Sequence, residues 1–170
     1  SDGAPCGEGE VCLELPAPRS AGAAVSFGDR IYVLGGVVPF EGSPDPVNQS
    51  IRTTSSVLFV DTTSFPLRWV EAPSLHDSRE HFNAVAVDGR IWVFQGRSEA
   101  STHIRGVESM RPDEGGWRRE QEAPVGASAN VLAAVGRSRV IRSPETSSSL
   151  TSIATGSAAG ADAASGGGQA

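Results

Sequence analysis

The chain of 170 residues contains no lysine, and all 14 of its basic residues are arginine. Its net charge is −6 and no basic stripe is visible, which argues against a dedicated nucleic-acid binder. Aromatic residues make up only 6%, whereas there are 20 glycines and 11 prolines, a composition that favours turns over a large helical core. No apolar run approaches the roughly 18 residues of a membrane-spanning helix, so we expect no membrane partner.

Cysteine is also scarce, with only Cys6 and Cys12 near the first residues. Two cysteines without a nearby histidine are too few for a structural zinc site. Whether they pair depends on the redox compartment and stays open. No basic segment followed by an apolar leader is visible, which favours the cytoplasm, while secretion stays possible.

The sequence does contain an internal repeat. The segment 19–36, RSAGAAVSFGDRIYVLGG, is matched by 79–96, REHFNAVAVDGRIWVFQG, at a constant offset of 60 residues. Repetition at such a period indicates an array of equivalent units rather than one ordinary core. Arrays of this kind usually present binding surfaces.

Each repeated unit is predicted to contain four strands, and no helical periodicity is visible. The turn signals Gly28-Asp29 and Asp88-Gly89 each separate two apolar runs. The strands expected in the first unit are 23–27, 31–34, 57–60 and a short one at 68–71 that carries Trp69. Those expected in the second unit are 82–87, 91–94, 107–110 and a short strand that Trp117 opens and that ends at 123–124.

Incomplete units flank these two. We expect residues 12–18 to form the closing strand of a preceding unit, and strands at 130–135 and 139–141 to begin a following one. From Pro144 the chain is rich in Ser, Thr, Ala and Gly and has no aromatic residue, which predicts disorder. The expected organisation is therefore a flexible segment 1–11, a closing strand 12–18, units 19–73 and 79–124, a partial unit 125–142 and a disordered tail 143–170.

Several spaced residues of these units resemble the kelch repeat, the blade of a kelch-type β-propeller. They include Gly35, Gly36, Trp69, Gly96 and Trp117, whose roles under this resemblance are structural: glycines allow close approach and Trp fills the space between blades. Gln95 departs from the pattern, because it replaces the first glycine of the pair. The resemblance covers roughly residues 12–142.

The resemblance implies an all-β fold of four-stranded antiparallel blades in an incomplete ring. About two and a half blades cannot close a ring that needs about four to eight. We therefore expect ring completion by missing blades or by another chain.

The resemblance further implies a protein-interaction scaffold that binds a partner protein through its inter-strand loops. The loops 37–55, 73–81 and 97–105 are expected to share one face. Arginine forks grip carboxylates, so an acidic peptide is one expected kind of partner. The candidate partner-binding residues are Arg79, Arg97, Arg105, His76, His81 and His103. Replacing Arg79 or Arg105 by alanine is predicted to weaken binding without lowering the melting temperature.

The alternative is a fragment of a kelch-propeller enzyme, oxidase-like or sialic-acid-epimerase-like, with its catalytic residues on missing blades. Tyr32 is the only tyrosine and lies in a core strand, which disfavours radical copper chemistry. No nucleophile–base pair is evident, so no catalytic residue is assigned. The three histidines do not share a strand face at i, i+2, and we expect neither a metal nor a cofactor.

Overall fold

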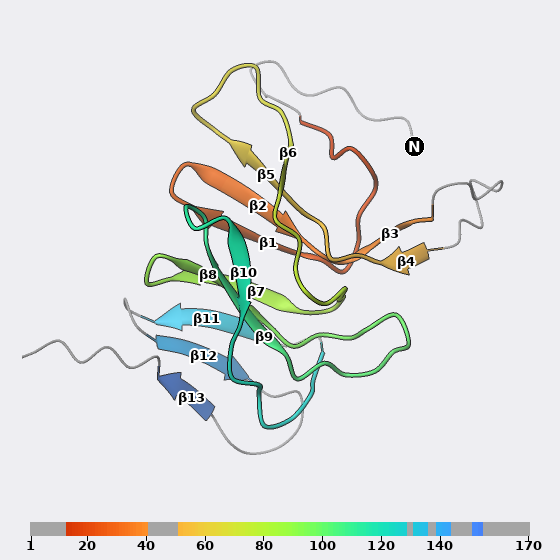
Figure 1. Cartoon of the computed structure of the whole chain (residues 1–170), viewed down its shortest axis with the longest axis vertical. Coiled ribbons are helices and arrows are strands. Elements are labelled where there is room, and N and C mark those ends of the chain that lie inside the picture. Colours follow the sequence, from red (N-terminus) through yellow and green to blue (C-terminus); the bar gives the residue numbers. More distant parts are fainter. Residues whose placement is uncertain (1–12, 41–50, 129–130, 136–138, 144–150, 155–170) are drawn as a thin grey trace, which may run out of the picture.

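Alternating apolar residues between glycine turns build the strands of this chain. The computed structural model describes residues 13–40, 51–128, 131–135, 139–143 and 151–154. These residues form thirteen strands and no helix, and every sheet is antiparallel (Figure 1). The predictions for 1–11, for Cys6 and Cys12, and for tail residues 144–150 and 155–170 lie outside the described residues.

The first repeated unit folds as a four-stranded sheet, the first blade, in the order β1-β2-β5-β6. A two-residue turn joins its first two strands, with Gly28 at φ +56°, as hairpin twist favours. The strands are β1 (Ala23–Phe27), β2 (Arg30–Leu34), β5 (Val57–Asp61) and β6 (Val70–Ala72).

The second blade repeats this topology, in the order β7-β8-β9-β10. Its first turn, Asp88-Gly89, also has positive φ values. The strands are β7 (Asn83–Val87), β8 (Arg90–Phe94), β9 (Val107–Arg111) and β10 (Gly116–Arg119). The predicted all-β fold of four-stranded antiparallel blades is confirmed.

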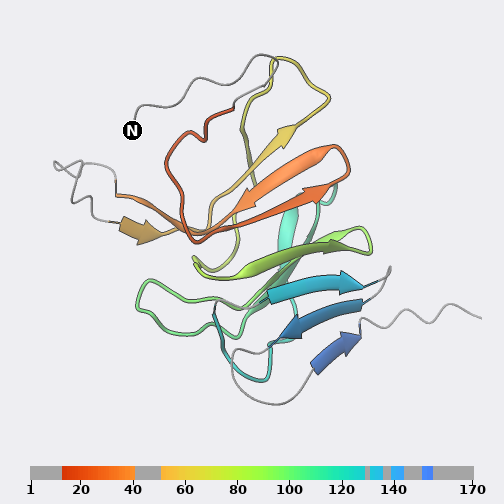
Figure 2. The same cartoon turned by 180° about the vertical axis from the view of Figure 1, so that it is seen from behind.

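The third sheet contains β11 (Val131–Val135), β12 (Arg139–Ser143) and β13 (Thr151–Ala154), paired in that order. The first strands of the three sheets, β1, β7 and β11, lie side by side in that order. The sheets therefore follow one another around a common centre (Figures 1 and 2). The two blades enclose the main core between them, and its buried residues are Tyr32, Leu34, Val57, Leu75, Phe82, Ile91, Val93, Met110 and Trp117.

Four segments differ most from the sequence prediction. Residues 13–19 form no strand. The closing strand of a blade pairs with the third strand of the same sheet, and no strand among the described residues pairs with residues 13–19. β6 begins at Val70, after Trp69, and β10 ends at Arg119, before the expected 123–124. β13 falls inside the segment predicted to be disordered, because the edge of β12 gives it backbone partners.

The segment between β2 and β5, predicted as the loop 37–55, contains a hairpin. Its strands are β3 (Val37–Pro39) and β4 (Ile51–Thr53), with Val37 opposite Thr53. The strand β3 starts directly after Gly36, whose φ is +91° and where a Cβ would come within 2.5 Å of the Ser20 carbonyl oxygen. This close approach requires glycine and sets the direction in which the hairpin leaves the blade.

Candidate interaction face

The three long loops lie along one side of the blades. We call this side the loop face and define it by the described residues of 37–55, 73–81 and 97–105. The hairpin β3–β4 and the loop 97–105 project from the same side, at the right of Figure 1, while the short β1–β2 and β7–β8 turns lie on the other side.

Main-chain hydrogen bonds join the loops of the loop face to one another. The Gly36 amide donates to the Arg79 carbonyl at 2.7 Å. Glu80 and Arg97 exchange two such bonds of 2.9 Å, and Arg97 also forms a bridge with His103. The sequence prediction that these loops share one face therefore agrees with the structure.

Arg79 does not reach the surface of this face. Its exposed fraction is 0%, and it donates to the carbonyls of Gln95 and Gly106 at 2.9 and 3.0 Å. Its other terminal nitrogen pairs with Glu108 at 2.5 Å. Burial lowers the pKa of Arg79, and the charge of Glu108 opposes that shift. The prediction that Arg79 contacts a partner is wrong, because its guanidinium is used inside the fold.

The repeat could have revealed this role. Arg19 holds the matching position and donates to the carbonyls of Gly35 and Ser56, the counterparts of the acceptors used by Arg79. Each arginine donates to the carbonyl of the residue that follows the second strand and to that of the residue that precedes the third. A charged residue that recurs with the packing glycines is therefore part of the blade.

Glu108 is a buried charge that the sequence analysis missed. It lies on β9 with an exposed fraction of 0%, where the first blade has Leu58. Besides Arg79 it accepts hydrogen bonds from the His76 amide at 2.8 Å and lies 2.9 Å from His76 Nδ1. The only signal was a carboxylate at the strand position where the first blade has the apolar Leu58. Its role is to hold the loop 73–79 against the second blade.

The remaining candidate residues are exposed or partly exposed. The Arg97 side chain is 34% exposed and pairs with Glu80 at 2.7 Å, and its guanidinium lies 3.3 Å from His81 Nδ1. The Arg105 side chain is 53% exposed and lies 3.6 Å from Glu122. His103 is exposed, and His76 lies apart from this group beside Glu108. Their proposed contact with a partner stays a prediction.

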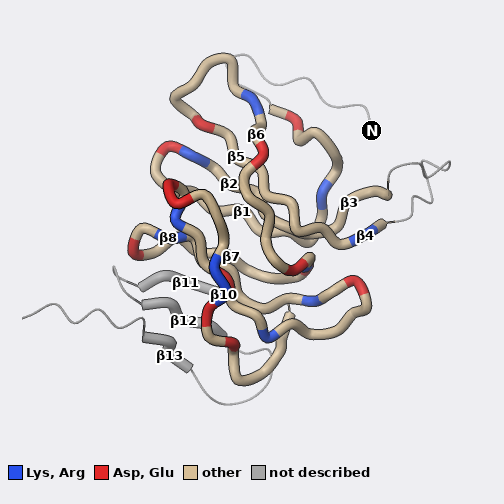
Figure 3. The backbone as a smooth tube through the Cα atoms, in the orientation of Figure 1, with Lys and Arg blue, Asp and Glu red and all other residues tan. Residues whose placement is uncertain are grey.

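Acidic and basic residues are interspersed over the blades rather than sorted into patches (Figure 3). In the part of the chain that the structure describes, no three His, Cys, Asp or Glu side chains are placed to hold a metal ion. The same residues contain no helix that could span a membrane.

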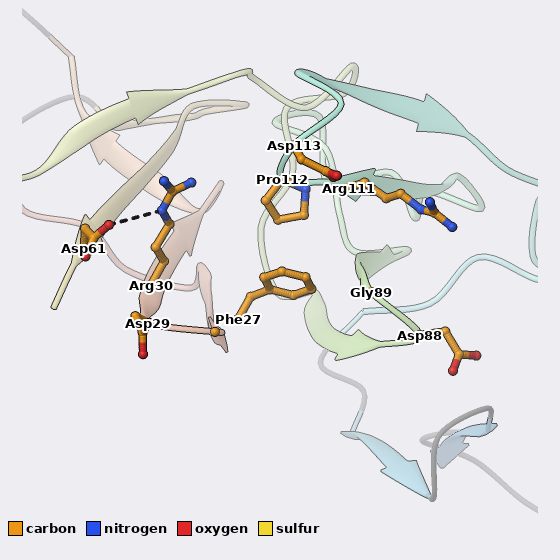
Figure 4. A pocket seen from close by; sticks show the side chains of 10 residues that line it. Phe27, Asp29, Arg30, Asp61, Asp88, Gly89, Arg111, Pro112 and Asp113 are labelled. Carbon is orange, nitrogen blue, oxygen red and sulfur yellow. Dashed lines mark ion pairs between the residues drawn. The ribbon is translucent and has the colours of Figure 1, made fainter. Parts of the chain in front are cut away.

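A cleft of about 860 Å³ lies on the opposite side, between the turns of the two blades (Figure 4). Phe27 and Pro112 line it together with charged residues from the turns. Arg30 pairs with Asp61 at 3.6 Å, and hydrogen bonds from Thr63 keep the pKa of Asp61 below its ordinary value. The other charged lining residues are Asp29, Asp88, Arg111 and Asp113.

Comparison with known proteins supports the resemblance inferred from the repeat. No protein-family model matches the chain. It is 28% identical over 79 residues to Kelch-like protein terF of Aspergillus terreus, and 31% identical over 100 residues to Alpha-scruin of Limulus polyphemus. The solved structure of YjhT superposes with a TM-score of 0.59 at 17% identity, covering 76% of this chain and 35% of that chain.

The chain is built of kelch-type β-propeller blades. It spans only 16% and 10% of the lengths of the two curated kelch-repeat relatives, which cover 46% and 59% of this chain. Propellers of this type commonly mediate protein interactions. The blades therefore define the scaffold, while the partner is a separate question.

Proposed function

We propose that this chain is a protein-interaction scaffold that binds a partner protein through the loop face. The observation that carries the proposal is a difference in exposure between arginines at repeated positions and residues of the non-repeated loops. The repeated arginines at the start of each unit, Arg19 and Arg79, are engaged inside the blades. The loops differ between the two blades, share one side and expose Arg97, His81 and Arg105.

An acidic segment of a partner suits this surface. Arg97 and Arg105 are paired with Glu80 and Glu122 at the surface. The exposed Arg105–Glu122 pair contributes little, about 0–1 kcal/mol, so a partner carboxylate can replace Glu122 at small cost. Arg97 keeps its contact with Glu80, whose side chain is only 13% exposed, while its own side chain is 34% exposed to a partner. The arginine fork then offers two parallel hydrogen bonds to the incoming carboxylate.

The double substitution Arg97→Ala/Arg105→Ala tests the proposal. We expect it to reduce partner binding at least about tenfold, the loss of one or two charge-assisted hydrogen bonds, and to lower the melting temperature only slightly, through the loss of the Arg97–Glu80 pair. The measurement is quantitative mass spectrometry of proteins that immobilised wild-type and variant chains retain. Arg118→Ala is the control, because its side chain is 60% exposed and pairs with Glu114 on the turn side. Equal retention of the same proteins by all three chains would refute the placement.

We also propose that a further blade covers the outer face of the first blade, the face turned away from the second. The repeat matches Ile31 to Ile91, and the two differ in exposure: Ile91 is 0% exposed beneath the first blade, whereas Ile31 is 41% exposed. Val33 is likewise half-buried where Val93 is fully buried. The outer face thus has the apolar character of an inter-blade face without its cover.

The two tryptophans support this interpretation. Trp117 Nε1 donates to the carbonyl of Pro73, the residue after the closing strand of the preceding blade, at 2.8 Å. Trp69 holds the matching place in the first blade, and its buried Nε1 has no partner within the described residues. A preceding blade, on missing parts of the polypeptide or on another chain, would supply such an acceptor. The native mass tests this proposal: a stable monomer of 17.6 kDa in the source cells would contradict it.

A further inference from the structure

Three ionisable side chains meet at one carboxylate oxygen on the loop face. The Glu80 side chain is only 13% exposed, and its Oε1 accepts a hydrogen bond from Arg97 Nε at 2.7 Å. The same oxygen lies 3.6 Å from Nδ1 of His81, whose side chain is 42% exposed. Arg97 Nη2 lies 3.3 Å from that Nδ1. The imidazole and the guanidinium therefore share one anion and also contact each other.

The first blade repeats this backbone without the ionisable side chains. The isolated bridge between Glu80 and Arg97 recurs there, and so does the left-handed φ of His81, which is +48°. The residues at the matching positions are Ser20, Val37 and, with a φ of +51°, Ala21. A blade therefore forms without this cluster, and folding does not require its chemistry.

The backbone holds the cluster in place. Glu80 and Arg97 exchange main-chain hydrogen bonds of 2.9 Å, and the His81 amide donates to the Ala21 carbonyl of the first blade at 2.8 Å. Within the described residues, the charged side chains that contact His81 are those of Glu80 and Arg97.

Other ionisable residues near His81 come from few elements. Of the strands packed against β7, which begins two residues after His81, β1 and β11 contain no ionisable residue. The strand β12 also contacts β7 and contains Arg139 and Arg142. The loop 97–105 carries, besides Arg97, the residues Glu99, His103 and Arg105.

The hydrogen bond between Arg97 and His81 exists only while the imidazole is neutral. A guanidinium only donates, so His81 Nδ1 accepts this bond with its lone pair. In a protonated imidazole both nitrogens are donors, and Nδ1–H then donates to Glu80 Oε1 instead. Arg97 Nη2 thereby loses an acceptor, Arg97 Nε keeps its bond to Glu80, and the loop face gains one positive charge.

We infer that His81 is a pH-sensitive control of carboxylate binding on the loop face. Protonation changes His81 from an acceptor for Arg97 into a second cation beside it, and an incoming carboxylate binds both. Histidine is the side chain whose charge ordinarily changes between pH 5 and 8. Binding of an acidic segment therefore strengthens as the pH falls through this range. This inference rests on the proposed function, since it names a regulation of the same surface.

The first test needs no partner. A pH titration of the complete chain by nitrogen-edited NMR follows the His81 ring and the Arg97 Nε–H signal, which is identified by its absence from Arg97→Gln. We expect the Arg97 signal to shift with the same midpoint as the His81 ring between pH 5 and 8, and to stay constant in His81→Asn. Asparagine tolerates the left-handed backbone at this position. An Arg97 signal that stays constant in wild type, or that shifts equally in His81→Asn, would overturn the inference.

His103→Asn is the matched control for this titration. It makes the same substitution at an exposed histidine of the neighbouring loop, and the shift of the Arg97 signal should remain. Loss of the shift in His103→Asn with its retention in His81→Asn would also overturn the role of His81.

The second test measures binding, with a fluorescently labelled tetraglutamate peptide as the probe. From pH 7.5 to pH 5.5, binding to wild type should strengthen about fivefold more than binding to His81→Asn, the effect of one exposed charge pair. The glutamate side chains stay ionised over this range. Fluorescence anisotropy measures both affinities. Equal pH responses of the two chains would overturn the control by His81 and leave the loop-face proposal intact. Peptide binding that is unchanged in Arg97→Ala/Arg105→Ala would instead contradict the proposed function, whatever the NMR titration shows.

Discussion

At the scale of single residues, two pairs of arginines in this chain have contrasting roles. Arg19 and Arg79 recur in both units and donate to matching backbone carbonyls. Arg97 and Arg105 do not recur and are partly exposed. The two groups should respond to substitution in opposite ways, one in stability and the other in binding.

Replacing Arg79 by alanine should lower the free energy of unfolding by about 3–5 kcal/mol. The substitution leaves Glu108 as a buried carboxylate without its closest cation and leaves two carbonyls without their donor. Urea denaturation followed by tryptophan fluorescence measures the change. Arg118→Ala, whose side chain is 60% exposed, should stay within about 0.5 kcal/mol of wild type. A cost below about 1 kcal/mol for Arg79→Ala would show that the buried pair is not needed.

The sequence allowed some of these roles to be predicted. It correctly placed Arg97 and Arg105 in surface loops, and the structural importance of the glycines follows from their left-handed φ values. It placed Arg79 wrongly because residue type alone does not reveal burial, although its recurrence at Arg19 was visible. The partnership of Arg79 with Glu108 joins residues 29 positions apart and required the fold.

At the scale of elements, the two blades agree in topology and differ at their closing tryptophans. Turn signals located the hairpins of β1–β2 and β7–β8 well, since two-residue glycine turns fix the register of the flanking strands. The hairpin β3–β4 escaped prediction because its strands have only three residues each and a long proline-containing segment separates them. β13 escaped because its order depends on the edge of β12 rather than on its own composition.

The tryptophans give a matched test of how consecutive blades are joined. Trp117→Phe removes packing and the hydrogen bond to the Pro73 carbonyl. Trp69→Phe removes packing and a donor that has no partner among the described residues. We expect Trp117→Phe to lower the free energy of unfolding by about 1 kcal/mol more than Trp69→Phe. Thermal or urea unfolding of the two variants measures the difference. Equal losses, or a larger loss at Trp69, would show that the bond to Pro73 does not link the blades.

At the scale of the whole molecule, the account depends on the blades being equivalent units stacked in one direction. The second blade is covered by the first, and the first blade has an uncovered outer face with the same residue types. The repeat predicted the two complete units, and the kelch resemblance implied that they are blades of an incomplete ring. It could not predict which inter-blade residues are covered, because that depends on neighbours outside each repeat.

The most direct measurement of this claim is the free energy of unfolding of Ile31→Ala and Ile91→Ala in the 170-residue chain. Both substitutions remove the same atoms from the same place in a second strand, so strand propensity cancels. The account predicts a loss of about 2–5 kcal/mol for Ile91→Ala, which is 0% exposed, and of about 1 kcal/mol or less for Ile31→Ala, which is 41% exposed. Equal losses at the two positions would contradict the stacking of the blades and the uncovered face of the first.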